Sequence, residues 1–225
     1  MKIFTNIATV NALQKMVFTL KKEWTSAFQI AGGLAILLIS SCQISSNNDV
    51  QQLPVFAPDG INMIVEIPAG TNHKIEINKE TGAFENDIEE GRIRVINFLP
   101  YPGNYGFIPS TLMEERRGGD GDALDVLMIG ESLPTGTVVS ITPIATLLLS
   151  DNGELDTKLI AIPADSTEVV LGAYNYTDLA IKHAAAKKMI EDWFLNYKGP
   201  GEMELIGWRD EVYALAEIKK WQIEK

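Results

Sequence analysis

The order of apolar and polar positions divides the chain into three parts. Residues 27–39, AFQIAGGLAILLI, form a run of 13 mostly apolar residues, and residues 43–52, QISSNNDVQQ, are polar without an apolar period. From residue 54 onward, short apolar runs alternate with clusters of Gly, Pro, Asn and Asp, which are typical of turns. Because no gap rich in Pro, Gly and Ser interrupts this last part, the pattern predicts a single folded domain at 54–225.

The first part of this domain is rich in short β-type runs. They predict strands at 61–67, 74–78, 92–98, 124–129, 137–145 and 158–162. The turn residues between these runs indicate an antiparallel meander or a small barrel.

Two helical patterns follow the strands. Between residues 178 and 197, apolar residues recur at intervals of three and four, with Thr177 as a candidate cap and Gly199 as a candidate stop. The repeating positions are Ala186, Met189, Ile190, Trp193, Phe194 and Tyr197. A second helix is predicted from residue 211 to the end, with an apolar stripe made of Val212, Leu215, Ile218 and Trp221. Strands followed by helices, without β-α-β alternation, indicate the α+β class.

The apolar run at 27–39 is shorter than the roughly 20 residues that span a bilayer as a helix, and it is typical of a signal peptide. Lys21 and Lys22 precede it, and Ser40 and Ser41 lead directly into Cys42. The sequence ISSC at 39–42 resembles a bacterial lipobox. That resemblance implies that Cys42 becomes the lipidated first residue of the mature chain and that acyl chains hold the protein to a membrane.

Residues 1–41 are thus expected to be a signal peptide and residues 42–53 a polar tether. The mature protein would then face outside the cytoplasm, on the periplasmic side of a membrane. Gln43 after the cysteine, in place of aspartate, favours the outer membrane in an organism that has one. An uncleaved signal anchor, or a true start at Met16, remains an alternative.

The charge balance narrows the class of partner. The chain has 30 acidic and 19 basic residues, a net charge of −11, and it therefore lacks the basic excess that binds nucleic acid. Small anions or metal ions fit this composition better. Cys42 is the single cysteine of the sequence, which excludes an intrachain disulfide framework and a cysteine-rich zinc site.

The segment GGDGDALDVLMIG at 118–130 is the most informative stretch. Asp120, Asp122 and Asp125 fall within six positions, and Asp125 stands inside an otherwise apolar strand. A carboxylate there is desolvated unless a positive charge meets it, and a divalent cation could do so. Ionised aspartate offers the hard oxygen ligands that Mg²⁺ and Ca²⁺ require.

Other interpretations of this segment stay open. Gly and Asp also dominate ordinary solvated turns, and an Asp-X-Asp metal site of the glycosyltransferase type fits the two-residue pattern. The spacing excludes an EF-hand, because Leu124 and Asp125 fall where an oxygen ligand and a glycine are needed.

A second acidic pair, Asp151 and Asp156, lies in SDNGELDTK between two apolar runs, an arrangement that is hairpin-like. Bases and phenols that could bind oxyanions accompany the acids along the chain. They are Lys74, Arg94, Tyr101, Tyr105, Lys158, Tyr197 and Lys198. Clustered acids for metals together with bases for oxyanions are typical of phosphoryl transfer, where charge neutralisation and alignment supply most of the catalysis.

From about residue 61 to residue 208, the chain resembles a family I soluble inorganic pyrophosphatase. The supporting segments occur in the family's order: IVEIPAG, HKIEINKETG, GRIRVINFLPYPGNYGFIP, DGDALDV, DNGELDTKLIAIP and NYK before a closing GW. Ala123 stands where the family's Asp-Gly-Asp element is usually followed by proline, and Asn152 stands where relatives often carry glutamate. The spacing favours Arg94 over Arg92 as the phosphate-binding arginine.

The resemblance implies a five-stranded OB-like β-barrel flanked by two C-terminal helices. It also implies Mg²⁺-dependent hydrolysis of pyrophosphate to two phosphates, with several Mg²⁺ ions in the site and Mn²⁺ or Zn²⁺ as substitutes, in a homo-oligomer. The alternative functions are a noncatalytic membrane-tethered module that binds metal or oxyanion, and a phosphoesterase that acts on another substrate.

The resemblance also assigns roles to individual residues. Asp120, Asp125 and Asp156 would bind two activating Mg²⁺ ions, with Asp151 holding further metal, and Asp122 would orient and deprotonate the attacking water. The phosphates would be bound by Lys74, Arg94, Tyr105, Tyr197 and Lys198. Supporting positions would be held by Glu66, Glu76, Tyr101 and Lys158.

Overall fold

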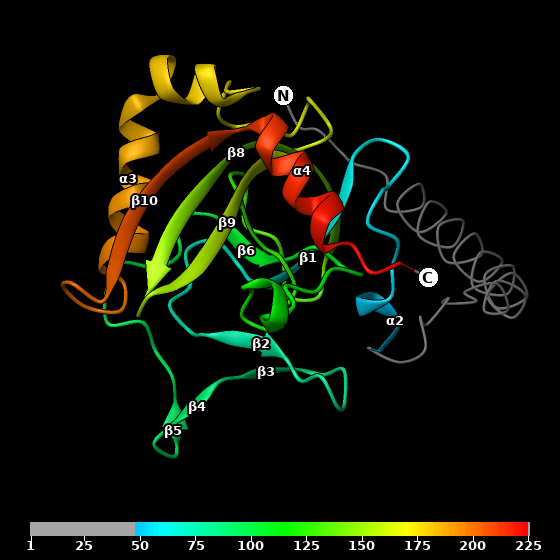
Figure 1. Ribbon diagram of the computed structural model, residues 1–225, viewed down its shortest axis with the longest axis vertical. Helices are drawn as coiled ribbons and strands as arrows, with labels where there is room; N and C mark the ends of the chain where they lie inside the picture. The colour runs from blue at the N-terminus through cyan, green and yellow to red at the C-terminus, as the bar shows by residue number, and fades with distance from the viewer. Residues whose placement is uncertain (1–47, 225) are drawn as a thin grey trace, which may run out of the picture. The chain divides into compact units, whose positions relative to one another are not determined.

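A closed ring of five strands forms the centre of the computed structural model, which describes residues 48–224 (Figure 1). The ring runs in the order β1, β6, β7, β9, β8, and β8 pairs back with β1. Its strands are β1 (Ile61–Ile67), β6 (Asn104–Phe107), β7 (Asp125–Met128), β8 (Val138–Asp151) and β9 (Glu154–Pro163). A sixth strand, β10 (Met203–Asp210), pairs with β8 on the edge opposite β9. The predicted five-stranded barrel and the α+β class are confirmed.

The strand pairing differs from an antiparallel meander in one place, because β7 and β9 run parallel. Parallel neighbours need a long connection between them. Here the chain runs from β7 through β8, reverses at the β8–β9 hairpin turn and so enters β9 parallel to β7. That hairpin is the one expected from SDNGELDTK. Its two-residue turn is Asn152–Gly153, with φ of 51° and 90°, as an Asn-Gly turn between twisted strands requires.

Two short antiparallel pairs extend from the barrel. They are β2 (Ile75–Ile77) with β3 (Phe84–Asn86), and β4 (Ile88–Glu89) with β5 (Arg92–Ile93). The predicted strand at 92–98 is wrong beyond Ile93. The sequence also missed β6 and β10, because β6 contains Gly106 and Asn104, which are poor strand formers, and β10 follows a Gly-rich turn.

The hydrophobic core has two parts, and β7 contributes to both. Leu127 belongs to the cluster that contains Trp193 of α3 (Ala184–Asn196), whereas Val126 belongs to the cluster that contains Trp221 of α4 (Glu211–Trp221). Because side chains alternate along a strand, β7 is buried on both faces, which explains why its sequence is apolar at nearly every position. Each C-terminal helix therefore closes a different part of the core.

The helices agree with their predicted ranges but differ in detail. A π-helical stretch (Asp178–Lys182) precedes α3, and the side chain of Asn175, not Thr177, accepts the backbone N–H of Asp178 at 2.8 Å. Gly199 follows the end of α3 with a φ of 127°, consistent with the predicted stop. In both helices the predicted stripe is partly wrong, since three of its members are exposed: Met189, Val212 and Leu215.

The predicted signal peptide and its lipidation site, Cys42, lie outside the described residues. Asn48–Gln51 form one helical turn, α2, and the backbone N–H of Ser110 donates to the carbonyl of Gln51 at 3.0 Å. Contact with the domain thus begins before residue 54. Within 48–224, no helix has both the length and the apolar character needed to cross a bilayer.

Substitution of Gly106 in β6 tests how closely β6 approaches the neighbouring strand β1. A Cβ at this position would overlap the carbonyl oxygen of Ile64 on β1, so we expect Gly106→Ala to lower the free energy of unfolding by about 1–3 kcal/mol or more. The control is Gly172→Ala, where a Cβ meets no atom within 4 Å. Urea unfolding of both variants measures the difference, and equal stabilities would contradict the described strand spacing.

Candidate active site

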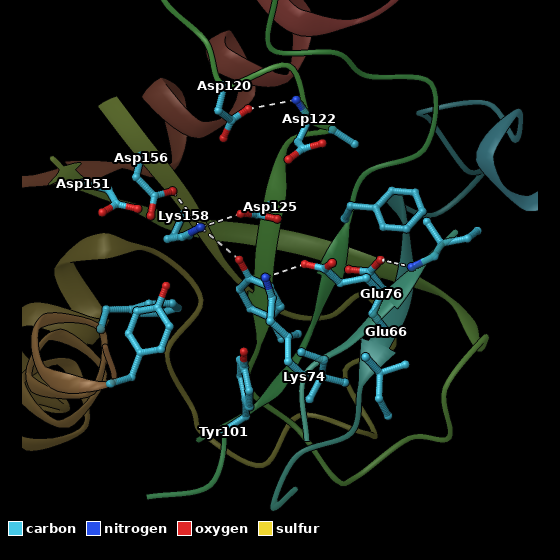
Figure 2. Close-up of a pocket in the computed structure, with 18 of the residues that line it drawn as sticks. Glu66, Lys74, Glu76, Tyr101, Asp120, Asp122, Asp125, Asp151, Asp156 and Lys158 are labelled. Carbon is cyan, nitrogen blue, oxygen red and sulfur yellow. Dashed lines mark hydrogen bonds and ion pairs between the residues drawn. The ribbon is translucent and has the colours of Figure 1, made fainter. Parts of the chain in front are cut away.

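A cavity of about 480 Å³ lies against the barrel strands, β2 and the end of α3 (Figure 2). Every site residue that the sequence predicted within the folded domain lines this cavity. These residues are Glu66, Lys74, Glu76, Arg94, Tyr101, Tyr105, Asp120, Asp122, Asp125, Asp151, Asp156, Lys158, Tyr197 and Lys198. Figure 2 shows the five aspartates around one part of the cavity and Lys74 and Tyr101 in another. Segments that are far apart in the sequence therefore contribute to one site.

Strand register brings the central charges together. Asp125 on β7 lies directly opposite Lys158 on β9. Asp156 precedes Lys158 by two positions on the same strand, so both side chains project to the same face. Asp125 shares its face of β7 with Leu127, which packs in the core cluster beside α3. The parallel β7–β9 pair thus places two carboxylates around one ammonium group.

Lys158 is the buried counter-ion of this group, with an exposed fraction of 5%. Its Nζ lies 2.5 Å from Oδ2 of Asp125 and 2.6 Å from Oδ1 of Asp156, and it donates to the Tyr105 hydroxyl at 2.9 Å. Burial alone would lower the pKa of Lys158, but the charges of Asp125 and Asp156 raise it well above its usual value. Burial also raises the pKa of Asp125, against the opposing effect of Lys158. The sequence did not foresee this partner for Asp125, because it did not predict the β7–β9 pairing.

Asp120 and Asp122 lie on the loop that precedes β7. The backbone N–H of Asp122 donates to Oδ1 of Asp120 at 3.0 Å, and the Asp122 carboxylate forms an ion pair with Lys79. Lys79 also lines the cavity, although it was not predicted from the sequence. The signal in the sequence was the turn-type segment NKETG at 78–82. In the structure, the Asn78 side chain accepts the backbone N–H groups of Glu80 and Thr81 at 3.0 Å and so fixes this turn.

The β8–β9 turn positions Asp151. The Asn152 side chain donates to Oδ1 of Asp151 at 3.0 Å, and Lys198, just after α3, forms an ion pair with the same carboxylate. The positive φ of Asn152 explains why this position carries asparagine, since Asn tolerates the left-handed region better than most residues. Asp151 consequently faces an amide and an ammonium group.

Glu66 lies at an irregularity in the pairing of β1 with β6, between Val65 and Ile67. A β-bulge of this kind redirects a side chain out of the regular alternation. Oε1 of Glu66 accepts the backbone N–H of Ile77 at 2.9 Å, and the residue is only 8% exposed. Burial raises the pKa of Glu66 to about 8. This carboxyl group is therefore mostly protonated at neutral pH.

Lys74 and Arg94 are joined through Asp87, an acid that was not predicted from the sequence. Asp87 accepts from Nη1 of Arg94 at 3.1 Å and lies 4.0 Å from Nζ of Lys74, which also pairs with Glu76 at 2.5 Å. Asp87 stands between β3 and β4, and its only sequence signal was an acid within FENDIEEGR. Arg94 lines the cavity, whereas Arg92 is exposed in β5. The preference for Arg94 agrees with this placement.

Aromatic side chains connect α3 to the barrel beside the cavity. The rings of Tyr197 and Trp193 stack with 4.9 Å between centroids, and Tyr101 lies 4.5 Å from Trp193 and 5.3 Å from Tyr105. Burial raises the pKa values of Tyr101, Tyr105 and Tyr197. The three phenols thus remain neutral at physiological pH and can donate hydrogen bonds.

The donor set of the cavity fits a hard divalent cation, because five aspartates supply carboxylate oxygens. Within residues 48–224, no three carboxylate or imidazole groups stand close enough to form a ready-made metal cluster. Four of the aspartates are paired with lysines instead: Asp122 with Lys79, Asp125 and Asp156 with Lys158, and Asp151 with Lys198. The position of Lys158 nevertheless identifies the space between Asp125 and Asp156 as one that stabilises positive charge.

Glu66 predicts a pH dependence of stability. Between pH 4.5 and about 8, the folded protein retains a proton on Glu66 that the unfolded chain releases, so stability falls as pH rises across this range. We expect Glu66→Gln to remove a slope of up to about 1.4 kcal/mol per pH unit. Urea unfolding from pH 5 to pH 8 measures it, with exposed Glu80→Gln as control. Parallel curves for Glu66→Gln and the unaltered chain would contradict the burial of a protonated Glu66.

Comparison with known proteins agrees with this geometry. The family model described as inorganic pyrophosphatase matches residues 63–224. The chain is 40% identical over 169 residues to the inorganic pyrophosphatase of Haemophilus influenzae, covering 72% of this chain and 89% of that protein. It is 39% identical over 168 residues to that of Sulfolobus acidocaldarius, covering 72% and 90%.

Solved structures give the same result. The crystal structure of the inorganic pyrophosphatase from Thermus thermophilus matches with a TM-score of 0.63 and 32% identity, covering 75% of this chain and 94% of that one. The structure from Neisseria gonorrhoeae matches with a TM-score of 0.61 and 35% identity, covering 75% and 94%. The fold, the sequence and the contents of the cavity therefore agree, and the chain belongs to the inorganic pyrophosphatase family.

Proposed function

We propose that this protein hydrolyses inorganic pyrophosphate to two phosphates, using water and divalent metal ions. The observation that carries the proposal is the composition of the cavity. Five aspartates line it together with the cationic side chains of Lys74, Arg94 and Lys198. Acids that can hold metal ions and bases that can hold phosphate oxygens thus face the same space, as hydrolysis of a multiply charged anion requires.

Mg²⁺ is the proposed metal, with Mn²⁺ or Zn²⁺ as substitutes. Asp120, Asp125 and Asp156 would hold the two activating ions, and Asp151 would contribute to a further one. When bound, these ions supply a water of lowered pKa and charge neutralisation at the phosphates. Because Lys158 already occupies the space between Asp125 and Asp156, its ammonium group would have to move for a metal ion to bind there.

Asp122 is the proposed proton acceptor. Its side chain is 60% exposed and paired only at the surface with Lys79, so it is accessible to a water molecule in the cavity. In the reaction, the water oxygen forms a bond to one phosphorus, the bond from that phosphorus to the bridging oxygen breaks, and Asp122 takes a proton from the water. The bridging oxygen leaves on the second phosphate.

The remaining polar groups would bind and orient pyrophosphate. Arg94 offers a planar guanidinium that can contact two phosphate oxygens, and Asp87 fixes that guanidinium by a hydrogen bond of 3.1 Å. Tyr105 and Tyr197 offer neutral phenol donors. Lys74 and Lys198 are paired with carboxylates, and the same ammonium groups can pair with phosphate oxygens, since both partners are oxyanions.

The proposal is tested by phosphate release from pyrophosphate by the purified full chain, with Mg²⁺ and with a chelator. We expect Mg²⁺-dependent turnover of pyrophosphate in preference to a nucleoside triphosphate or a simple monoester. Asp122→Asn should lower kcat about 10²–10⁴-fold, because a positioned acid or base contributes this much. Asp59→Asn, at an exposed site that does not line the cavity, is the matched control.

Two outcomes would contradict the enzyme proposal. A protein that binds Mg²⁺ without turnover would indicate a noncatalytic binding module, and faster turnover of an organic phosphate would indicate a different phosphoesterase. Equal activity of Asp122→Asn and Asp59→Asn would contradict the proposed role of Asp122, but not the proposed hydrolysis.

We propose further that Cys42 carries a lipid anchor that holds the protein to a membrane outside the cytoplasm. The proposal is supported by the sequence ISSC after a short apolar run. We expect Cys42→Ser to move the protein from the sedimented membranes to the soluble fraction, whereas Ser45→Ala leaves it in the membranes. Membrane retention of Cys42→Ser would contradict the anchor.

A further inference from the structure

The loop that carries Asp120 and Asp122 is attached to the end of the C-terminal helix. The backbone N–H of Leu112 donates to the carbonyl of Trp221 at 2.9 Å, and the N–H of Ile223 donates to the carbonyl of Ser110 at 2.9 Å. These two bonds, together with a bridge between Thr111 and Gln222, form a short antiparallel ladder. The start of the loop is therefore paired with the C-terminal end of α4 and the residues just after it.

The loop then closes back on itself beside the aspartates. The N–H of Met113 donates to the carbonyl of Asp122 at 2.7 Å, and the N–H of Gly121 donates to the carbonyl of Met113 at 2.8 Å. A Cβ at Gly119 would overlap the Met113 carbonyl, so the backbone at Gly119 lies in close contact with the backbone at Met113. A displacement of Met113 would therefore move Asp122 with it.

Arg117 joins the far side of this loop to α4. It lies in a short 3₁₀ turn (Glu115–Arg117) that projects from the loop. Its Nη2 donates to the carbonyl of Lys220 at 3.0 Å, and its guanidinium carbon lies 4.7 Å from the centre of the Trp221 ring. The last carbonyls of a helix lack partners within the helix, and a cation there also interacts favourably with the helix dipole. Arg117 thus donates a hydrogen bond to a carbonyl at the end of α4 and places a cation over the ring of Trp221, the last residue of that helix.

The surface of α4 that Arg117 contacts is buried and hydrogen-bonded. Trp221 is 2% exposed, and its Nε1 donates at 2.8 Å to Glu217, which is 6% exposed. Lys220 pairs with Glu217 at 3.1 Å and lies 4.2 Å from the same indole ring. An indole fixed by a buried carboxylate offers a stable platform for a guanidinium group.

We propose that Arg117 is a positioning residue that holds the Asp120–Asp122 loop in its metal-binding conformation through the end of α4. Arg117 does not line the cavity, so it acts through the loop and not on substrate. The proposal rests on the proposed function for its catalytic consequence, although its structural part can be tested in the metal-free protein.

Arg116 provides a matched control. It is the neighbouring arginine, its side chain is 80% exposed, and it pairs with Glu114 at 2.8 Å within the same turn. Removal of Arg116 therefore deletes the same charge from the same turn. The contacts that Arg117 makes with α4 stay in place.

The first test is amide hydrogen exchange of the full chain in the presence of a chelator. We expect Arg117→Ala to increase exchange across residues 112–124 while exchange across the β8–β9 hairpin, 138–163, stays unchanged. Arg116→Ala should leave both segments unchanged, and Arg117→Lys should restore part of the protection, because it retains the cation but lacks the planar fork. Equal exchange in the two alanine variants, or increased exchange throughout the domain, would overturn the proposal.

The second test is calorimetric titration of the metal-free chain with Mg²⁺ alone. Loss of an outer residue that orients metal ligands lowers metal affinity 10–100-fold in typical cases, so we expect Arg117→Ala to weaken Mg²⁺ binding by about tenfold relative to Arg116→Ala. In the pyrophosphate assay, the half-saturating Mg²⁺ concentration should rise while kcat at saturating Mg²⁺ is retained. Unchanged Mg²⁺ affinity would overturn the proposal. Absence of pyrophosphate turnover in the unaltered chain would instead contradict the proposed function and leave the exchange result standing.

Discussion

The ammonium group of Lys158 between the carboxylates of Asp125 and Asp156 is the interaction on which the site depends. All three side chains lie on strands of the barrel and are largely buried, so water screens the repulsion between the two acids only weakly. The parallel pairing of β7 with β9 places Lys158 directly opposite Asp125, so the same backbone register that builds the barrel also neutralises its buried charge. The barrel could not carry these acids without a positive charge at this point.

The other acids of the cavity are each placed by a different local device. A β-bulge redirects Glu66, an Asn-Gly turn presents Asp151, and the end of α4 supports the loop that holds Asp120 and Asp122. Each of these devices fixes a segment of backbone by strand register or by hydrogen bonds. The carboxylates are therefore held in place before any ligand arrives, which reduces the ordering that binding requires.

Lysines accompany the acids at nearly every point of the cavity. Lys79, Lys158 and Lys198 each pair with an aspartate, and Lys74 pairs with Glu76. The two signs of charge therefore neutralise each other locally, although the whole chain has a net charge of −11. Such a site suits a ligand that is itself made of both signs, such as a multiply charged anion bound together with metal cations.

Much of this could be predicted from the sequence. The apolar run around Asp125 gave the strand β7, the three-and-four period gave the two C-terminal helices, and the ordered motifs gave the family and a set of site residues that line one cavity. These features could be read because each depends on residues close together in the chain, or on motifs long enough to be specific.

Contacts between residues that are distant in the sequence could not be predicted in this way. Asp87 and Lys79 look like ordinary surface charges in the sequence, and only the folded chain brings them to Arg94 and Asp122. The sequence by itself determined a set of side chains that line one cavity and most of the elements that bear them. Only the tertiary structure decided that Lys158 meets Asp125 and that α4 supports the aspartate loop, because strand order and helix docking are set by contacts between residues distant in sequence.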